Sequence, residues 1–155
     1  MKKLNDLTRI GKAILKRMLE RMLSFKSPYS DPWYRDDRSA RSSLQKAIIY
    51  IKLGARFDAK SDSAGKILRT AAFQGDVEAI KYLLEKGVDI NVVDKHKETA
   101  LMLATIKHHR EVVQLLLESG ADIKIISDAG NHTAFSFAEL WGDAEIIELF
   151  RARGA

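Results

Sequence analysis

Apolar side chains recur at every third or fourth position in several short stretches of this sequence, which is the spacing of a helix that buries one face. Six of these stretches form pairs, and two residues separate the helices expected in each pair. The expected pairs cover residues 67–74 with 77–86, 100–107 with 110–119, and 134–141 with 144–152. One more helix is expected at 43–53, where one face carries Leu44, Ala47, Ile48 and Ile51. The pattern therefore predicts an all-helical chain.

Residues typical of helix ends flank these stretches. Thr99 and Thr133 are placed to cap the first helix of a pair, and Asp76 and Asp143 are placed to cap the second. Glycines suited to end a helix follow the last apolar residues at Gly54, Gly87 and Gly120. The segments between the pairs should form protruding, hairpin-like loops at residues 55–66, 88–98 and 121–132.

The pairs repeat with a period of 33 residues. The stretch Gly87-Val88-Asp89-Ile90-Asn91 returns 33 residues later as Gly120-Ala121-Asp122-Ile123-Lys124, and one extra residue near Ser127 lengthens the last interval to 34. Leucines, alanines and glutamates upstream of these stretches match at the same spacing. A fixed period of this length indicates a stack of supersecondary units rather than a single wound core.

The repeating unit resembles the ankyrin repeat. The segment from Glu111 to Asp122 is a close copy of the second half of that family's pattern, and Thr99-Ala100-Leu101-Met102 stands where the family has Thr-Pro-Leu-His. The resemblance covers residues 43–155 and implies an ankyrin-like helical repeat solenoid, all-α, with about three and a half repeats. It also implies that the function is to bind another protein, but it names no partner.

Residues 1–26 form a basic segment in front of the repeats, followed by an expected linker at residues 27–42. Within the segment, residues 3–24 have apolar positions at helical spacing among lysines and arginines, so we expect an amphipathic helix. Three roles are open for it: it caps the first half repeat, docks on a partner protein, or lies on an anionic membrane surface. In the linker, Trp33 and Tyr34 are expected to fill the gap between this helix and the stack.

The net charge of +5 is concentrated at the amino-terminal side, where residues 1–30 carry eight basic and two acidic groups. The repeats are close to neutral, so nucleic acid is not an expected partner. Basic residues interrupt every apolar run near the start, which argues against a signal peptide, and no run has the length of a membrane span. The absence of cysteine fits a reducing compartment, and we expect a cytoplasmic protein.

Candidate chemistry is sparse. The adjacent pair His108 and His109 should point in different directions, and no cysteine or nearby carboxylate pair completes a metal site around it. The sequence also has no pattern of a nucleophile beside a base and no glycine-rich phosphate loop. We therefore expect no catalytic residue, no cofactor and no metal, and we predict that the protein is not an enzyme.

The resemblance places a candidate binding surface on the inner helices. In the family pattern, two residues between the inner-helix alanines and the glycine face outward on the concave side. Here these residues are Phe73 and Gln74, Ile106 and Lys107, and Leu140 and Trp141. We call the four large apolar residues Phe73, Ile106, Leu140 and Trp141 the ladder, and Gln74 and Lys107 border it. The loop tips expected to border the ladder are Asp62, Ser63, Lys95, His96, Ala129 and His132.

Two interpretations of the ladder are open. Large apolar groups ringed by polar residues have the make-up of an interface centre, so the ladder and the loop tips predict an adaptor, inhibitor or immunity-type partner of another protein. Alternatively, the ladder packs under the amino-terminal helix or the neighbouring repeat. The alternative function is that of a peripheral membrane protein anchored by residues 3–24.

Overall fold

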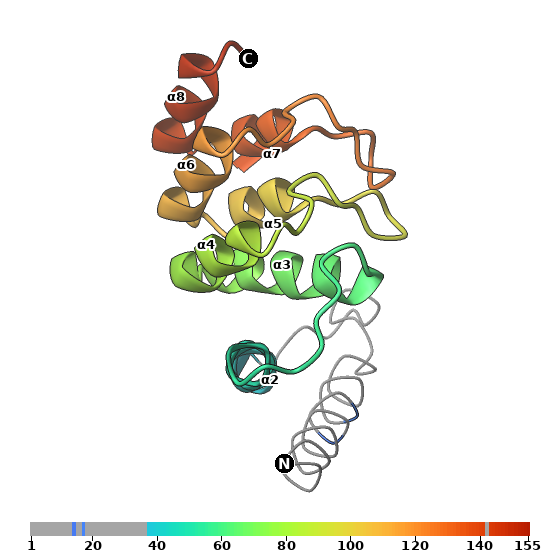
Figure 1. The fold of residues 1–155 in the computed structure, drawn as a ribbon. Helices are drawn as coiled ribbons and strands as arrows, with labels where there is room; N and C mark the ends of the chain where they lie inside the picture. Colours follow the sequence, from blue (N-terminus) through green and yellow to red (C-terminus); the bar gives the residue numbers. More distant parts are fainter. Residues whose placement is uncertain (1–13, 15–16, 18–36, 142) are drawn as a thin grey trace, which may run out of the picture. The chain divides into compact units, whose positions relative to one another are not determined.

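The computed structural model describes residues 14, 17, 37–141 and 143–155. The chain divides into two compact units, Met1–Asp58 and Ala59–Ala155. In the first unit, the described helix is α2 (Asp37–Lys52) (Figure 1). Apart from residues 14 and 17, the predicted helix at 3–24 lies outside the described residues, and so does the aromatic plug at Trp33 and Tyr34.

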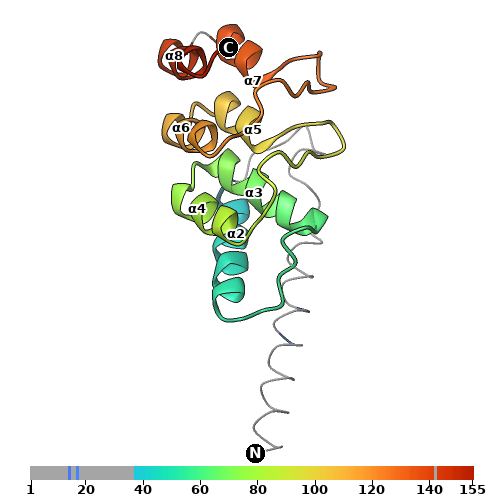
Figure 2. The ribbon, with the colours of Figure 1, turned by 45° about the horizontal axis from the view of Figure 1, so that its top comes forward.

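The second unit consists of three helix pairs joined by loops. The pairs are α3 (Asp62–Gln74) with α4 (Val77–Glu85), α5 (Ala100–Ile106) with α6 (Arg110–Glu118), and α7 (Ala134–Trp141) with α8 (Ala144–Ala152). In Figures 1 and 2 the first helices of the pairs form one layer and the second helices form another. No described residue lies in a strand. The predicted all-α repeat stack is confirmed.

The predicted helix caps are also confirmed. The Thr99 side chain accepts a hydrogen bond from Met102 N, and the carboxylate of Asp76 accepts one from Ala79 N at 2.9 Å. Thr133 and Ser136 cap α7 reciprocally, because each side-chain oxygen accepts from the other residue's backbone N–H. Gly87 follows α4 with φ +82°, a conformation that ends a helix and favours glycine.

Two helices begin earlier than predicted. α3 begins at Asp62 rather than 67, because Ser61 provides an upstream cap: its side chain accepts a hydrogen bond from Ala64 N at 3.3 Å. α2 begins at Asp37, inside the segment expected to be a linker. Both prolines lie upstream of Asp37, so no residue between Asp37 and the predicted start interrupts a helix.

The core of the second unit lies between the two layers. Apolar side chains from each pair are fully buried there, and the largest of them are Leu68, Ile80, Leu83, Leu101, Met102, Val112, Val113, Leu116, Ile146 and Phe150. On α2, the predicted apolar face is buried as expected at Leu44, Ala47, Ile48 and Ile51. The spacing of the apolar residues therefore predicted the buried face of α2 correctly.

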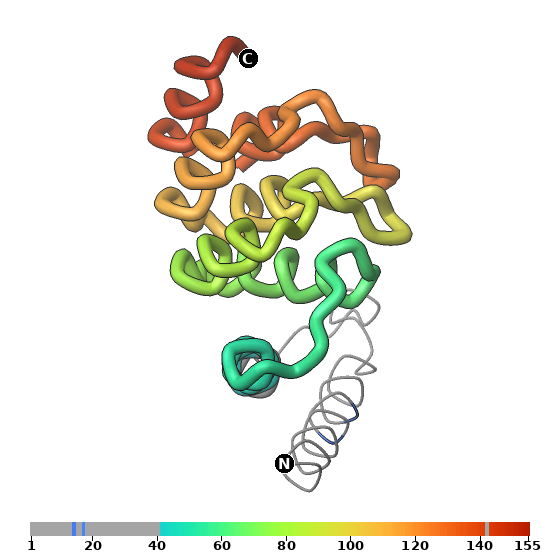
Figure 3. Tube along the Cα trace, viewed as in Figure 1, coloured from blue at the N-terminus to red at the C-terminus, as the bar shows by residue number. Residues whose placement is uncertain are grey.

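The loops between helix pairs bind one another through polar contacts. Asn91 accepts a hydrogen bond from Asp122 N at 2.8 Å, and Asp128 N donates to His96 O at 3.0 Å. Lys97 forms an ion pair with Asp128 at 2.8 Å. Figure 3 shows the two loops that carry these residues projecting on the same side of the helices. These contacts hold successive loops in register.

Candidate partner-binding surface

The ladder residues at the end of α7 are exposed. Leu140 and Trp141 are 63% and 58% exposed, although both are large and apolar. One repeat earlier, Ile106 ends α5 and is half-buried, whereas Lys107 is exposed. The sequence therefore predicted correctly that the end of α7 presents an apolar surface.

The other end of the ladder is a correction. Phe73 and Gln74 were expected to be exposed, but each is only 7% exposed. The neighbouring repeat covers this end of α3, because Lys107 Nζ lies 4.2 Å from the centre of the Phe73 ring and His109 Nε2 is 2.9 Å from Phe73 O. Phe73 is thus a core residue, as the alternative interpretation held. The side-chain amide of Gln74 has no hydrogen-bond partner among the described residues.

The predicted loop tips divide into three groups. Lys95 and Ala129 are exposed. His96 and His132 are half-buried, and the His132 ring packs on Phe137 with 5.1 Å between ring centres.

Asp62 and Ser63 are a second correction, because they lie in the first turn of α3 rather than at a loop tip. The physical reason is the upstream cap at Ser61. Of the predicted loop tips, only Lys95, His96, Ala129 and His132 therefore lie in loops, between α4 and α5 and between α6 and α7.

Sequence reasoning missed an exposed apolar pair on these loops. Val93 is 40% exposed and Ile126 is 52% exposed, and they occupy equivalent positions 33 residues apart in successive loops. The period already contained this signal, because both positions carry a β-branched aliphatic residue. We call Val93 and Ile126 the loop pair, and Leu140 and Trp141 the α7 patch.

Polar side chains join the turns after α5 and α7 and the starts of α6 and α8. His108 Nδ1 lies 2.8 Å from Asp143 Oδ2, and Arg110 pairs with Glu145 at 2.7 Å. The hydrogen bond from His108 holds the pKa of the Asp143 carboxyl below its usual range. The same carboxylate caps α8 by accepting from Ile146 N. Asp143 therefore fixes both the turn next to the α7 patch and the start of the last helix.

A second group of charged residues lies at the base of the loop between α4 and α5. Burial raises the pKa of Glu98, and the nearby carboxylate of Asp94 adds to this effect. On α3, burial lowers the pKa of Lys66, and the charge of Arg69 adds to it. Arg69 is itself buried and stands where the family pattern has histidine. These charged residues are therefore buried or half-buried where α3 meets the loop between α4 and α5.

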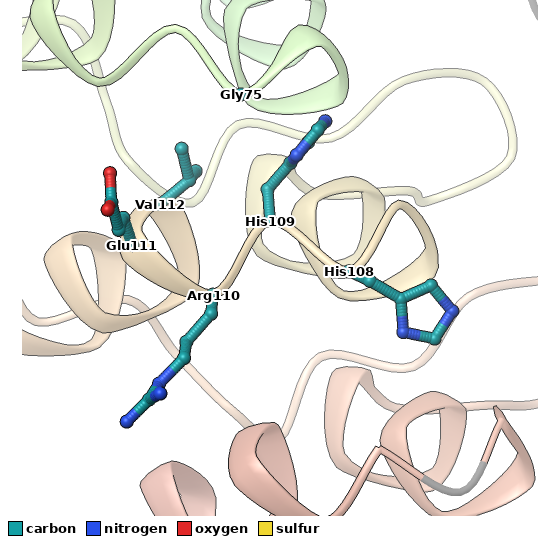
Figure 4. Close-up of a pocket in the computed structure, with 6 residues that line it drawn as sticks. All are labelled: Gly75, His108, His109, Arg110, Glu111 and Val112. Carbon is teal, nitrogen blue, oxygen red and sulfur yellow. The ribbon is translucent and has the colours of Figure 1, made fainter.

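The adjacent histidines line a hollow of about 300 Å³ together with Gly75, Arg110, Glu111 and Val112. In Figure 4 the His109 ring points toward Gly75, and the His108 ring points away from it. A Cβ added at Gly75 would lie 2.8 Å from His109 Nδ1, so glycine allows this close approach. Each histidine thus contacts a different neighbouring repeat. The described residues contain no group of three metal-binding side chains.

Comparison with known proteins gives a family and two partial relatives. A family model described as ankyrin repeats, in three copies, matches residues 38–127 and 67–155. The chain is 35% identical over 111 residues to a probable E3 ubiquitin-protein ligase of Oryza sativa subsp. japonica, across 70% of this chain and 22% of that protein. It is 28% identical over 90 residues to a transient receptor potential cation channel subfamily A member 1 homolog of Caenorhabditis elegans, across 49% of this chain and 7% of that protein.

Proposed function

This chain belongs to the ankyrin repeat family, and from that premise we propose that it is a non-enzymatic module that binds a partner protein through the α7 patch. Family membership supports protein binding in general. The choice of surface depends on the α7 patch, where a leucine and a tryptophan are both more than half exposed. Exposed tryptophan is uncommon on a surface that stays in water, and central tryptophans dominate the binding energy of many interfaces.

Other exposed residues on the inner helices and loops support a recognition role for the same repeats. Lys107, a border residue of the ladder, is exposed one repeat away at the position equivalent to Trp141. Lys95 and Ala129 are exposed on the loops, and the loop pair adds two apolar contacts there. A small apolar centre with polar residues at its border is the usual arrangement of a protein interface. We assign Lys107, Lys95 and Ala129 to the border, with His96 and His132 as partly covered contributors.

The two relatives do not identify the partner. The two relatives are described as a ligase and as a channel, and this chain spans only 22% and 7% of their lengths. Their activities therefore do not transfer to it. We propose that the chain acts as a stoichiometric adaptor, inhibitor or immunity-type partner in the cytoplasm, because the exposed α7 patch and the exposed loop residues Lys95 and Ala129 offer a recognition surface.

The test uses the tagged full chain, captured with its partner from its own cells and then measured against the purified partner. Trp141→Ala should weaken binding at least tenfold, and Trp141→Phe should recover part of the loss. Ile49→Ala is the control, because Ile49 is also a large, exposed apolar residue but lies on α2. It should leave the affinity for the partner unchanged. Wild-type affinity in Trp141→Ala, with the partner still bound one to one, would show that the binding surface lies elsewhere.

The alternative function is that of a peripheral membrane protein anchored by residues 3–24. Of these residues, the structure describes only 14 and 17. Among the described residues, no helix has the length and apolar content needed to cross a membrane. The amino-terminal anchor therefore stays a prediction from sequence. If the α7 patch is the functional surface, removing residues 3–24 should leave the affinity for the captured partner intact.

A further inference from the structure

Helix α2 has apolar residues on two opposite sides. One side is the buried face described above. On the other side, Ile49 is 52% exposed, and Leu53, one turn later, is 65% exposed. Leu53 N donates to Ile49 O at 2.9 Å, so the helical turn continues to Leu53 and brings the two side chains together on one face. We call these two residues the α2 pair.

Basic side chains flank the α2 pair on both sides. Lys46 and Lys52 lie three residues before and after Ile49, which places them about 60° to either side of it on the helix. Both lysines are exposed, as is Arg56 just beyond the helix. The sequence from Arg38 to Phe57 contains five basic residues and no aspartate or glutamate. The exposed side of α2 is therefore apolar at its centre and positive at its edges.

The charge of the two units differs strongly. Residues 1–58 hold 14 basic and six acidic side chains, a net charge of +8, whereas residues 59–155 hold 12 basic and 15 acidic side chains, a net charge of −3. A partner of α2 should thus be anionic. A juxtaposed apolar pair and long basic side chains suit the boundary between phospholipid headgroups and acyl chains, where lysine stems extend along apolar surface toward the phosphates.

We propose that the exposed face of α2 binds an anionic phospholipid surface, with Ile49 and Leu53 inserted at the headgroup boundary and Lys46 and Lys52 beside the lipid phosphates. A protein groove fits this face less well. A helix that docks in a groove presents anchors at i, i+3, i+4 and i+7. Around the α2 pair, the neighbouring exposed positions are polar at Gln45, Lys46 and Lys52, so a groove would receive only two anchors.

This inference is independent of the proposed function, because it uses residues in the other unit. Two apolar side chains make a weak anchor, so the affinity should depend mainly on charge. Each basic residue near an anionic membrane strengthens binding about fivefold at low ionic strength, and salt weakens this attraction.

The test is sedimentation of the full chain with vesicles of phosphatidylcholine, with and without about 30% phosphatidylserine. The wild-type chain should bind the anionic vesicles, bind neutral vesicles at least tenfold more weakly, and dissociate as salt rises. Ile49→Ser and, separately, Leu53→Ser should each weaken anionic binding at least fivefold. Replacing both Lys46 and Lys52 with Gln should weaken it about 25-fold, at about fivefold per charge.

The controls are matched to these variants. Ile126→Ser changes the same residue type at the same exposed fraction of 52%, but in the other unit, and should bind like wild type. Lys124→Gln, also exposed, is the control for charge. Equal binding to neutral and anionic vesicles would overturn the proposal, as would wild-type binding in Ile49→Ser and Leu53→Ser. Tight binding to an acidic polypeptide with no response to either serine variant would assign the basic face to a protein partner instead.

Discussion

Phe73→Ala distinguishes a core residue from a binding residue at one ladder position. The ring is 7% exposed and lies beneath Lys107 Nζ at 4.2 Å. Truncating a buried phenylalanine removes its apolar surface and leaves a cavity, which together cost about 3–5 kcal/mol. For a chain of this size we therefore expect Tm to fall by about 10 °C. Trp141→Ala should change the free energy of unfolding by less than about 1 kcal/mol, because the side chain is exposed.

The assay is urea unfolding of the full chain, followed by circular dichroism at helical wavelengths, with both variants beside the wild type. Thermal scans provide the Tm values. Partner affinity is then measured per folded molecule, so a loss of stability is not counted as a loss of binding. A free energy of unfolding for Phe73→Ala within about 1 kcal/mol of the wild-type value would contradict a core role for Phe73. Destabilisation of Trp141→Ala as strong as that of Phe73→Ala would contradict an exposed binding role for Trp141.

Three further changes test local contacts. Gly75→Ala should lower the free energy of unfolding by more than about 1 kcal/mol, because φ is +73° and the new Cβ would lie 2.8 Å from His109. Gly87→Ala is the control: its φ is also positive, but the added Cβ would meet no atom, so urea unfolding should show a smaller loss. Glu98→Gln should raise Tm at pH 7: burial raises the pKa of Glu98, so stability from its neutral form is present below the unfolded value of 4.5 and is lost as pH rises through the folded pKa. Asp143→Asn should lower Tm at pH 7. The His108 hydrogen bond lowers the pKa of Asp143, so stability from its carboxylate is present above the unfolded value of 3.8 and is lost as pH falls through the folded pKa. Melting curves across pH check both, and a difference from wild type that stays constant with pH would contradict either.

The helices and their caps could be predicted because their determinants are local. Thr99 lies three residues before the N–H that it caps, and Gly87 directly follows the last turn of its helix region. The early start of α3 was not predicted, because its cap lies outside the stretch of regular apolar spacing. Ser61 lies six residues before the predicted start, outside the window in which apolar spacing indicates a helix. A helix-capping residue is difficult to recognise from sequence when the residues after it show little helical spacing of apolar side chains.

Burial along the ladder could not be predicted in this way, because it depends on the repeat that follows. Phe73 and Leu140 occupy equivalent ladder positions, yet one is 7% exposed and the other 63%. The ring of His109, one repeat after α3, reaches back to Phe73 O. The position equivalent to His109 in the next repeat is Asp143, whose shorter side chain pairs with His108 and caps α8 instead of covering the end of α5.

The ladder is therefore graded rather than uniform. Its α3 end contributes to the contact between repeats, and its α7 end presents an apolar surface to solvent. Register shows which residues are equivalent, whereas contacts from another repeat, such as those that Lys107 and His109 make with Phe73, cover one of them. Because only the exposed end offers a large apolar area to a partner, substitutions at Phe73 should act through stability and those at Trp141 through affinity. A partner that protected Trp141 but not Lys107 from solvent would contact the end of α7 and not the end of α5.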